Sequence, residues 1–285
     1  MIVARLRIFD LDTSQAETVM ATDMLIEAPN WAPQTRSILV NSAGRLYRVP
    51  LDAPQLQLVD TGGLAKLNND HGLSPDGSVL AISDKSGRAT WRGKDSCIFV
   101  LPAEGGVPRR VTENTPSWWH GWSPDGARLV YTCVRNETFG IATIPVDGGD
   151  ETILISGPGH YDGPDYTPDG AWVWFNSDRG GEMELWRIRP DGRDMEQMTA
   201  EPTVNWFPHP SPDGRHVLYL AYAQGTEGHP ANLPVTLRLM DLSDGATREL
   251  IALRGGQGTI NVPCWAPDGR RFAYVDYPNP EDEGD

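Results

Sequence analysis

Cysteine is scarce in this sequence and offers no framework for a small disulfide-bonded or zinc-bound fold. The three cysteines, Cys97, Cys133 and Cys264, lie far apart, are odd in number and form no C-x-x-C pair. Disulfide frameworks and thiolate zinc sites need paired or closely spaced cysteines, so neither is indicated. We therefore expect all three thiols to lie in the core.

Long hydrophobic runs and uninterrupted runs of Lys and Arg are also missing. Arg5 and Arg7 interrupt the apolar residues of the N-terminus, which excludes a secretion signal and a membrane span. We expect a soluble protein, cytoplasmic as written and periplasmic only if the chain is a processed or truncated form. The formal net charge of −15 argues against nucleic-acid binding. Residues 278–285 are predicted to be a flexible acidic tail.

The sequence does contain a repeat. The tetrapeptide Ser/Thr/Ala-Pro-Asp-Gly occurs at residues 74–77, 123–126, 167–170, 211–214 and 266–269, and a degenerate copy lies at 31–34. The six prolines stand 42 to 55 residues apart, which is the length of a four-stranded propeller blade. Proline presets φ and glycine accepts a positive φ, so each tetrapeptide is predicted to be a turn rather than a site.

Aromatic residues accompany the repeat. In four copies an aromatic side chain stands two residues before the proline, at Trp31, Trp122, Tyr166 and Trp265. Rings placed at one position of successive repeats are typical of packing between blades. We predict that these four side chains belong to the core.

These features predict an all-β fold, a six-bladed β-propeller with four-stranded antiparallel blades. Residues 1–277 form the single propeller, and its sixth blade is shared between residues 1–20 and residues 257–277. Joining both chain ends in one sheet leaves no open seam in the ring. A monomer is expected.

The repeats resemble those of the TolB-like propeller family, whose blades carry a W-S-P-D-G signature and an S-D-R loop. The matching residues are Trp122-Ser123-Pro124-Asp125-Gly126 and Asn176-Ser177-Asp178-Arg179-Gly180-Gly181. The resemblance implies the fold, but similar blades occur in periplasmic TolB, in prolyl-oligopeptidase-like enzymes and in oligogalacturonate lyases. The sequence has no G-x-S-x-G pattern, which argues against serine peptidase activity.

Residues that enter the innermost strands of a propeller point into the mouth of its channel. In this chain they are rich in His, Asn, Asp and Trp. A long loop over residues 223–232 lies on the same side, where it is either a lid or specificity loop or an ordinary surface insertion. We expect ligand-binding residues among His71, Trp118, His120, Asp162, Asn205, Trp206, His209, His229, Gln257 and Asn261.

The histidines leave three interpretations open. His71 and His120 stand four residues before a repeat proline, and His209 stands one residue later in its repeat. They could hydrogen-bond to nearby loops, bind a ligand without metal, or hold a divalent metal ion with Asp70 or Asp162 behind them. The third interpretation resembles the channel metal site of oligogalacturonate lyases.

A second loop, residues 83–95, carries Lys85, Arg88, Arg92 and Lys94 beside Trp91. Such a cluster is suited to an anionic sugar or a carboxylate, or is ordinary solvated surface. The sequence therefore favours a non-catalytic propeller that binds a small polar ligand, a glycan or a peptide at the channel mouth. The alternatives are a metal-assisted lyase or hydrolase acting on an acidic carbohydrate, and a protein–protein scaffold.

Overall fold

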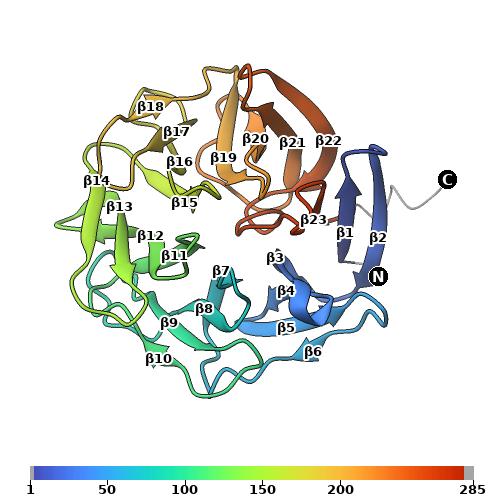
Figure 1. Cartoon of the computed structure of the whole chain (residues 1–285), viewed down its shortest axis with the longest axis horizontal. Helices are drawn as coiled ribbons and strands as arrows, with labels where there is room; N and C mark the ends of the chain where they lie inside the picture. Colours follow the sequence, from blue (N-terminus) through green and yellow to red (C-terminus); the bar gives the residue numbers. More distant parts are fainter. Residues whose placement is uncertain (1–2, 279–285) are drawn as a thin grey trace.

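The computed structural model describes residues 3–278, and it confirms the predicted six-bladed propeller (Figure 1). Five blades are four-stranded antiparallel sheets, and the sixth is a three-stranded sheet completed by a short bridge. Most of the predicted tail, 278–285, lies outside the described residues. Within 3–278 no helix is long and apolar enough to cross a membrane.

The first two blades run outward from the centre of the ring. Their strands are β3 (Glu27–Ala32), β4 (Ser37–Ser42), β5 (Arg45–Pro50) and β6 (Gln57–Leu58), then β7 (Leu67–Leu73), β8 (Val79–Asp84), β9 (Cys97–Pro102) and β10 (Arg109–Arg110). A short 3-10 turn, η1 (Pro33–Thr35), stands where the degenerate tetrapeptide was noted.

The next three blades repeat the same order. Their strands are β11 (Ser117–Trp122), β12 (Arg128–Arg135), β13 (Thr138–Pro145) and β14 (Thr152–Ser156); β15 (Tyr161–Tyr166), β16 (Val173–Ser177), β17 (Glu184–Ile188) and β18 (Glu196–Gln197); and β19 (Thr203–Pro210), β20 (His216–Ala223), β21 (Leu233–Asp241) and β22 (Thr247–Gly255). The sixth blade contains β23 (Arg271–Asp276), β1 (Ala4–Asp10) and β2 (Gln15–Thr22).

Each Pro-Asp-Gly tetrapeptide is a turn between an innermost strand and the next one, as predicted. In the first complete copy the Ser74 hydroxyl donates to Asp76 Oδ1 at 2.6 Å, and the Gly77 N–H donates to the Ser74 carbonyl at 2.8 Å. The φ of Gly77 is +72°, a value that favours glycine. The hydroxyl bond lowers the pKa of Asp76 to about 2, so this acceptor stays ionised.

The ring is closed by strands from both ends of the chain. β1 pairs with β23 in an antiparallel register from Arg5↔Asp276 to Asp10↔Arg271. The guanidinium of Arg5 donates two hydrogen bonds of 2.8 Å to the buried carboxylate of Asp276. The Ala273 N–H donates to the Cys264 carbonyl at 2.9 Å, which places the residues before β23 at the innermost position of this blade.

The aromatic residues before the turns pack between blades. Trp31, Trp122, Tyr166 and Trp265 are all buried, as predicted. The indole N–H of Trp122 donates to the Gly72 carbonyl at 3.1 Å, and that of Trp265 donates to the His209 carbonyl at 2.9 Å. Each of these bonds joins one blade to the preceding blade, so the rings fasten the propeller together. The three cysteines are buried and free.

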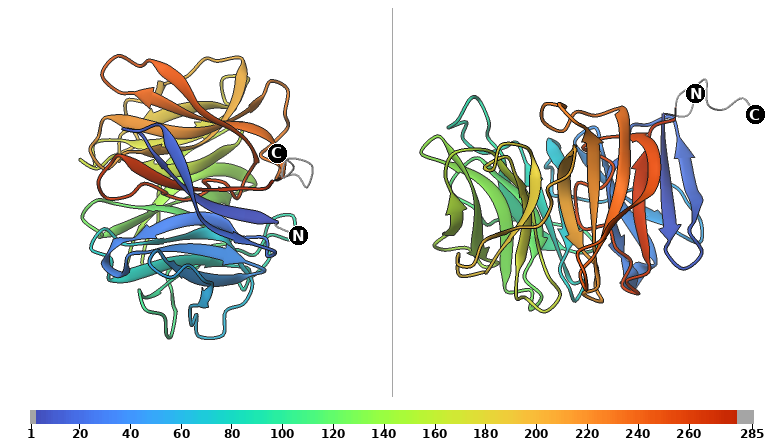
Figure 2. Two further views of the ribbon diagram at one scale, coloured as in Figure 1. Left: turned by 90° about the vertical axis from the view of Figure 1, so that its right-hand side faces the viewer. Right: turned by 90° about the horizontal axis from the view of Figure 1, so that it is seen from above.

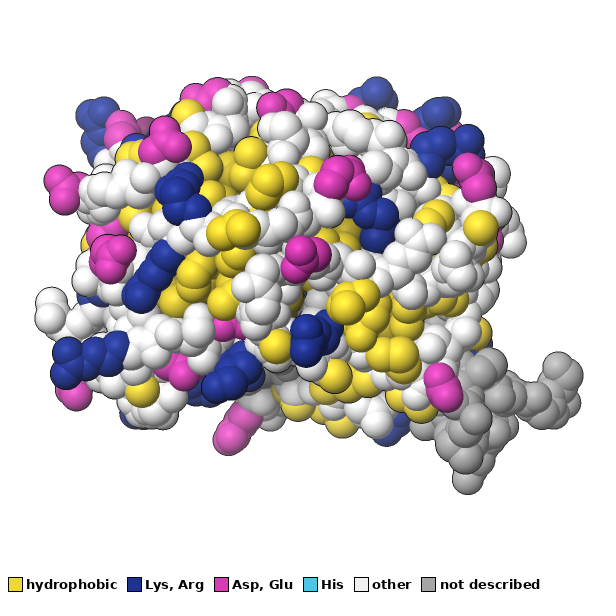
Figure 3. Space-filling model, turned by 90° about the horizontal axis from the view of Figure 1, so that it is seen from below, with side chains coloured by type: hydrophobic (Ala, Val, Ile, Leu, Met, Phe, Trp, Pro, Cys, Tyr) yellow, Lys and Arg dark blue, Asp and Glu magenta, His cyan; other side chains and the backbone are white. Residues whose placement is uncertain are grey.

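The blades stand side by side in a disc, and their strands run across its thickness (Figure 2). Each innermost strand therefore has one end near each face of the disc. Figure 3 shows the outer side of the first two blades, where apolar side chains lie among scattered charges and no histidine is visible. His71, His120 and His209 lie on the innermost strands β7, β11 and β19.

Candidate functional site

The five assigned innermost strands (β3, β7, β11, β15 and β19) each lead into a turn of the repeat, so their two ends gather different residues. We call the end where these strands begin the upstream end, and the other the turn end. Trp118 and Trp122 lie on one strand, four residues apart, which separates the two ends by roughly 13 Å.

A buried histidine–carboxylate pair lies at the upstream end. His120 Nε2 lies 3.0 Å from Asp162 Oδ1, and the same oxygen accepts hydrogen bonds of 2.9 Å from the Thr132 hydroxyl and the Gly163 N–H. His120 and Asp162 both lie at β-bulges of their strands. A bulge re-aims side chains, and this explains how residues of two adjacent blades meet.

Two further histidines face the second oxygen of the same carboxylate. His160 Nε2 lies 3.6 Å and His229 Nε2 lies 3.7 Å from Asp162 Oδ2. Both separations exceed a hydrogen bond, so Oδ2 accepts none from these rings. The side chains of His160 and His229 are 28% and 22% exposed, whereas that of His120 is 4% exposed. The two outer histidines are therefore within reach of solvent, and the inner one is not.

Aromatic rings hold these outer histidines. The ring of His229 lies 4.4 Å from Trp206 and 5.4 Å from Phe207 between centroids. The ring of His160 lies 4.2 Å from Phe139 and 5.5 Å from Trp206. The rings that contact the two outer histidines thus come from different blades: Phe139 from the third blade, and Trp206 and Phe207 from the fifth.

The backbone around both histidines is tied down. The His160 N–H donates to Asp178 Oδ1 at 2.6 Å, and Asp178 belongs to the S-D-R loop noted in the sequence. His229 lies in the predicted long loop, where the Tyr222 hydroxyl donates to the Pro230 carbonyl at 2.9 Å. Both anchors reduce the freedom of the segments that carry the imidazoles.

Asp70 joins the group from the second blade. Its Oδ1 accepts a hydrogen bond of 2.8 Å from Asn261 Nδ2 in the sixth blade, and its Oδ2 is buried without a partner among the described residues. Asp70 also interacts electrostatically with His120 and Asp162 of the third and fourth blades. A carboxylate that reaches four blades lies near the axis of the ring.

We call Asp70, His120, His160, Asp162 and His229 the upstream cluster. Burial alone would raise the pKa of Asp162, but its bond to His120 and the charge of His120 hold that pKa well below its usual range. Burial lowers the pKa of His120, but the bond and charge of Asp162 outweigh it, and the net pKa is raised. Burial raises the pKa of Asp70 to about 6.

Two further predicted residues, Asn205 and His209, lie outside the upstream cluster and form hydrogen bonds that support the fold. His209 uses both ring nitrogens, on Asp165 Oδ2 at 3.1 Å and on the Ile260 carbonyl at 2.6 Å. The Asn205 amide donates to the Glu184 carboxylate at 2.8 Å. These two side chains connect strands and blades, and the cluster leaves them out.

His71, Trp118 and Gln257 show no hydrogen bond of their side chains to the cluster. His71 is buried with both ring nitrogens unpartnered among the described residues, and burial lowers its pKa to about 4. Trp118 and Gln257 are half-buried. These three positions stay predictions.

Metal binding by His71, His120 and His209 gains no support from this geometry. Within residues 3–278 no group of three or more His, Cys, Asp or Glu side chains is arranged to hold a metal ion. His209 would have to give up two hydrogen bonds to become a ligand. His71, His120 and His209 stand at similar repeat positions, but each lies at a shift of strand register, where a bulge can re-aim a side chain.

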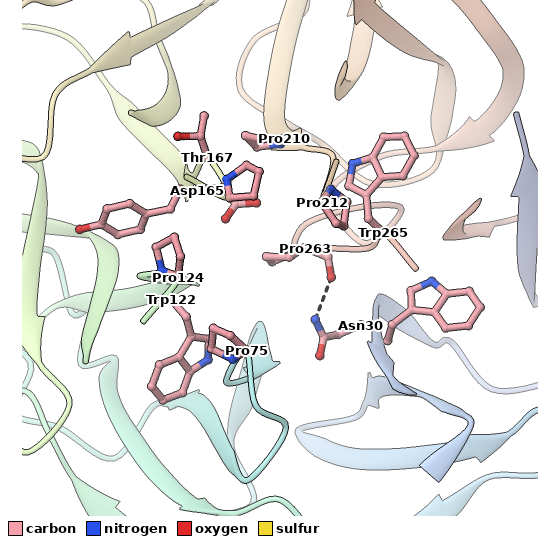
Figure 4. Close-up of a pocket in the computed structure, with 13 residues that line it drawn as sticks. Asn30, Pro75, Trp122, Pro124, Asp165, Thr167, Pro210, Pro212, Pro263 and Trp265 are labelled. Carbon is pink, nitrogen blue, oxygen red and sulfur yellow. Dashed lines mark hydrogen bonds between the residues drawn. The ribbon is translucent and has the colours of Figure 1, made fainter. Parts of the chain in front are cut away.

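The turn end contains a pocket of about 340 Å³ (Figure 4). Prolines of successive turns surround the centre of the ring there, and Trp122 and Trp265 lie farther out. Two of its polar side chains already have partners, because Asn30 Nδ2 donates to the Pro263 carbonyl at 2.8 Å and Asp165 pairs with His209. The indole N–H of Trp31 is buried without a partner among the described residues. This pocket was not expected from the sequence.

Sequence reasoning also missed Phe139 and Thr132 as parts of the upstream cluster's surroundings. Thr132 lies on the second strand of the third blade and Phe139 on its third strand, away from the segments that precede the turns. The basic loop, in contrast, does lie beside the cluster, because Trp91 contacts Phe139 at 5.2 Å between centroids and Arg92 lies over Trp91. No periodic pattern in the sequence marks these residues, because contacts between blades form only when the blades are arranged in a ring.

Comparison with known proteins shows the family. A family model described as the TolB beta propeller domain matches residues 114–232. The uncharacterized protein Atu1656 of Agrobacterium fabrum is 48% identical over 273 residues, which cover 95% of this chain and 92% of that protein. The chain belongs to the TolB-like propeller family.

Solved structures agree with this assignment of the TolB-like propeller. An Agrobacterium tumefaciens protein provisionally described as TolB is 46% identical and has a TM-score of 0.93, over 98% of this chain and 99% of that chain. An oligogalacturonate lyase in complex with manganese has a TM-score of 0.59 at 16% identity, over 89% of this chain and 75% of that chain. The second likeness concerns the fold alone.

Proposed function

We propose that this TolB-like propeller is a binding protein that takes a small polar ligand, a glycan or a peptide at the upstream cluster. The observation that supports this most is Asp162 Oδ2, which belongs to an ionised carboxylate and faces two partly exposed imidazoles beyond hydrogen-bond distance. A buried charge with unused acceptor capacity is costly to the fold and is typical of a binding site.

Preorganisation also favours binding. Bulges aim His120 and Asp162, the S-D-R loop anchors His160, and aromatic rings hold His229. A ligand that meets groups already fixed in place loses less conformational entropy on binding. The same rigid residues offer no nucleophile–base pair, so binding rather than covalent chemistry is the conclusion we draw.

The test combines ligand-observed NMR with trialanine, glucose and digalacturonic acid, each measured without metal, and elemental analysis of the protein after incubation with manganese chloride. The four compounds represent a peptide, a neutral sugar, an acidic sugar and the metal of the lyase alternative. We expect at least one organic probe to bind the wild-type protein, and Asp162→Asn to weaken that binding about tenfold or more. His216→Ala, at the start of β20 and at the turn end of the fifth blade, is the matched control and should leave binding unchanged.

Two results would contradict the proposal. If Asp162→Asn leaves the affinity of every bound organic probe unchanged, the binding site lies away from the upstream cluster. Stoichiometric manganese that is lost in His120→Ala, together with cleavage of digalacturonic acid, would establish the lyase alternative instead.

A further inference from the structure

The donors and acceptors of the upstream cluster define the charge of the ligand that it suits. Asp162 Oδ2 is an anionic acceptor, and His160 Nε2 and His229 Nε2 lie 3.6 and 3.7 Å from it. In the neutral imidazole either nitrogen can be an unprotonated acceptor. Burial lowers the pKa of His229, which keeps that ring neutral at pH 7.

Three acceptors that converge on one point match a group with three donors. A primary ammonium has three N–H donors and a positive charge, whereas a hydroxyl has one donor and a carboxylate has none. We propose that the upstream cluster binds the primary ammonium group of its ligand, with the three N–H donors directed to Asp162, His160 and His229. This inference rests on the proposed binding function and names the ligand chemistry of the same site.

The surrounding rings favour the same charge. Trp206 and Phe139 contact the two imidazoles, and Phe207 lies beside His229. The rings of Trp206 and Phe207 are buried and exclude water from one side of the imidazoles, and the attraction between a cation and Asp162 is stronger where water is excluded.

The buried part of the cluster contains more carboxylates than histidines that pair with them. His120 balances one carboxylate, Asp162, at 3.0 Å. Asp70 adds a second carboxylate whose Oδ2 is buried without a partner among the described residues. With one histidine against these acids, an incoming positive charge lowers the electrostatic cost of burying them.

The test compares probes of one shape and different charge. Isothermal titration should give 1,4-diaminobutane a dissociation constant at least about tenfold lower than those of 1,4-butanediol and succinate. Alanyl-alanine amide and its N-acetylated form make the second arm, which distinguishes a peptide amino terminus from a free small amine. Binding of the unblocked peptide with loss on acetylation would identify a peptide source, and binding of the diamine alone a small amine.

Two variants separate the acceptors from the packing. Asp162→Asn should raise the dissociation constant of the diamine about tenfold or more. His229→Phe keeps a ring against Trp206 but removes the Nε2 acceptor, and it should weaken the diamine several-fold without changing circular dichroism. His216→Ala is again the control.

The outcomes distinguish this inference from the binding function itself. If butanediol or succinate binds as tightly as the diamine and depends on Asp162, the ammonium inference is overturned and the site remains. If the diamine and the peptide amide fail to bind at 10 mM, roughly the weakest measurable range, the ammonium inference is also overturned. If His229→Phe binds the diamine as tightly as the wild type does, the His229 imidazole is not one of the three acceptors.

Discussion

The two ends of the innermost strands are built from different chemistry. At the turn end, indole N–H groups of Trp122 and Trp265 donate to carbonyls of the preceding blades, and the polar groups of Asn30 are fully used. At the upstream end, Asp70 Oδ2 has no partner among the described residues, and Asp162 Oδ2 faces imidazoles beyond bonding distance. The turn end leaves the Trp31 indole N–H, a neutral donor, without a partner among the described residues, whereas the upstream end leaves carboxylate oxygens with unused capacity to accept.

This difference shows that a cavity and a binding site need not coincide in a propeller. The pocket of about 340 Å³ lies at the turn end, where repeated prolines and aromatic rings meet. Perturbed titratable groups lie at both ends, but Asp76 and Asp165 at the turn end are held by bonds that build the turns and join the blades. Those at the upstream end, Asp70, His120 and Asp162, interact with one another beside two partly exposed imidazoles. Perturbed pKa values in a preorganised cluster are the stronger indication of function, because packing alone does not require them.

The largest expected effect tests whether the turn end is structural. Trp122→Ala should lower the free energy of unfolding by about 3–5 kcal/mol, because it removes a buried ring and its bond to Gly72. Trp118→Ala, on the same strand at the upstream end, should cost about 1 kcal/mol or less, because Trp118 is half-buried. Urea unfolding of both variants measures the two losses of unfolding free energy. Equal losses would contradict the structural difference between the two ends.

The second effect concerns the charged pair at the upstream end. Asp162→Asn should lower the free energy of unfolding by about 2–4 kcal/mol, because it breaks a buried pair. The lowered pKa of Asp162 gives stability above its unfolded value of 3.8, and the raised pKa of His120 gives stability below its unfolded value of 6.5.

The loss in Asp162→Asn should therefore be largest between about pH 4 and pH 6.5. Urea unfolding over this range gives the profile, and NMR titration gives the pKa of His120, which should fall below 6.5 in the variant. A loss of stability that is constant with pH would show that Asp162 acts only through neutral hydrogen bonds.

The third effect has the opposite sign. Asp70→Asn keeps an acceptor for Asn261 and removes a buried carboxyl whose pKa is raised to about 6. A raised carboxyl pKa makes the wild type lose stability as pH rises from about 4 to about 6. The variant should therefore gain stability relative to the wild type across that range and keep the gain at higher pH. Thermal unfolding at pH 4, 5, 6 and 7.5 measures this, and a gain that shrinks with pH would contradict it.

The smallest effect concerns the outer histidines. His229→Phe should change the free energy of unfolding by less than about 1 kcal/mol, because the ring is partly exposed and the replacement keeps its contact with Trp206. Chemical denaturation checks this value. A much larger loss would show that the loop of residues 223–232 supports the fold as well as the site.

Much of the fold could be predicted from the sequence, because its determinants are local and repeated. Proline, aspartate and glycine fix each turn within four residues, and the spacing of the turns gives the blade length. Ring closure followed from the half-blades at the two chain ends, and the pairing of β1 with β23 confirms it.

The site could be predicted only in part, because it depends on contacts between blades. Sequence reasoning placed His120, Asp162 and His229 in one region, and the structure brings them together. It also included Asn205 and His209, whose side chains turn into the fold. The repeat does not reveal which residue of a bulge points inward, since a shift of one residue reverses the direction of a side chain.

The most direct measurement is a crystal structure of the protein soaked with 1,4-diaminobutane. Our account predicts ligand density at the upstream cluster, with a terminal nitrogen within hydrogen-bond distance of Asp162 Oδ2. Density confined to the pocket lined by Trp122, Trp265 and the repeat prolines, with none beside Asp162, would contradict it.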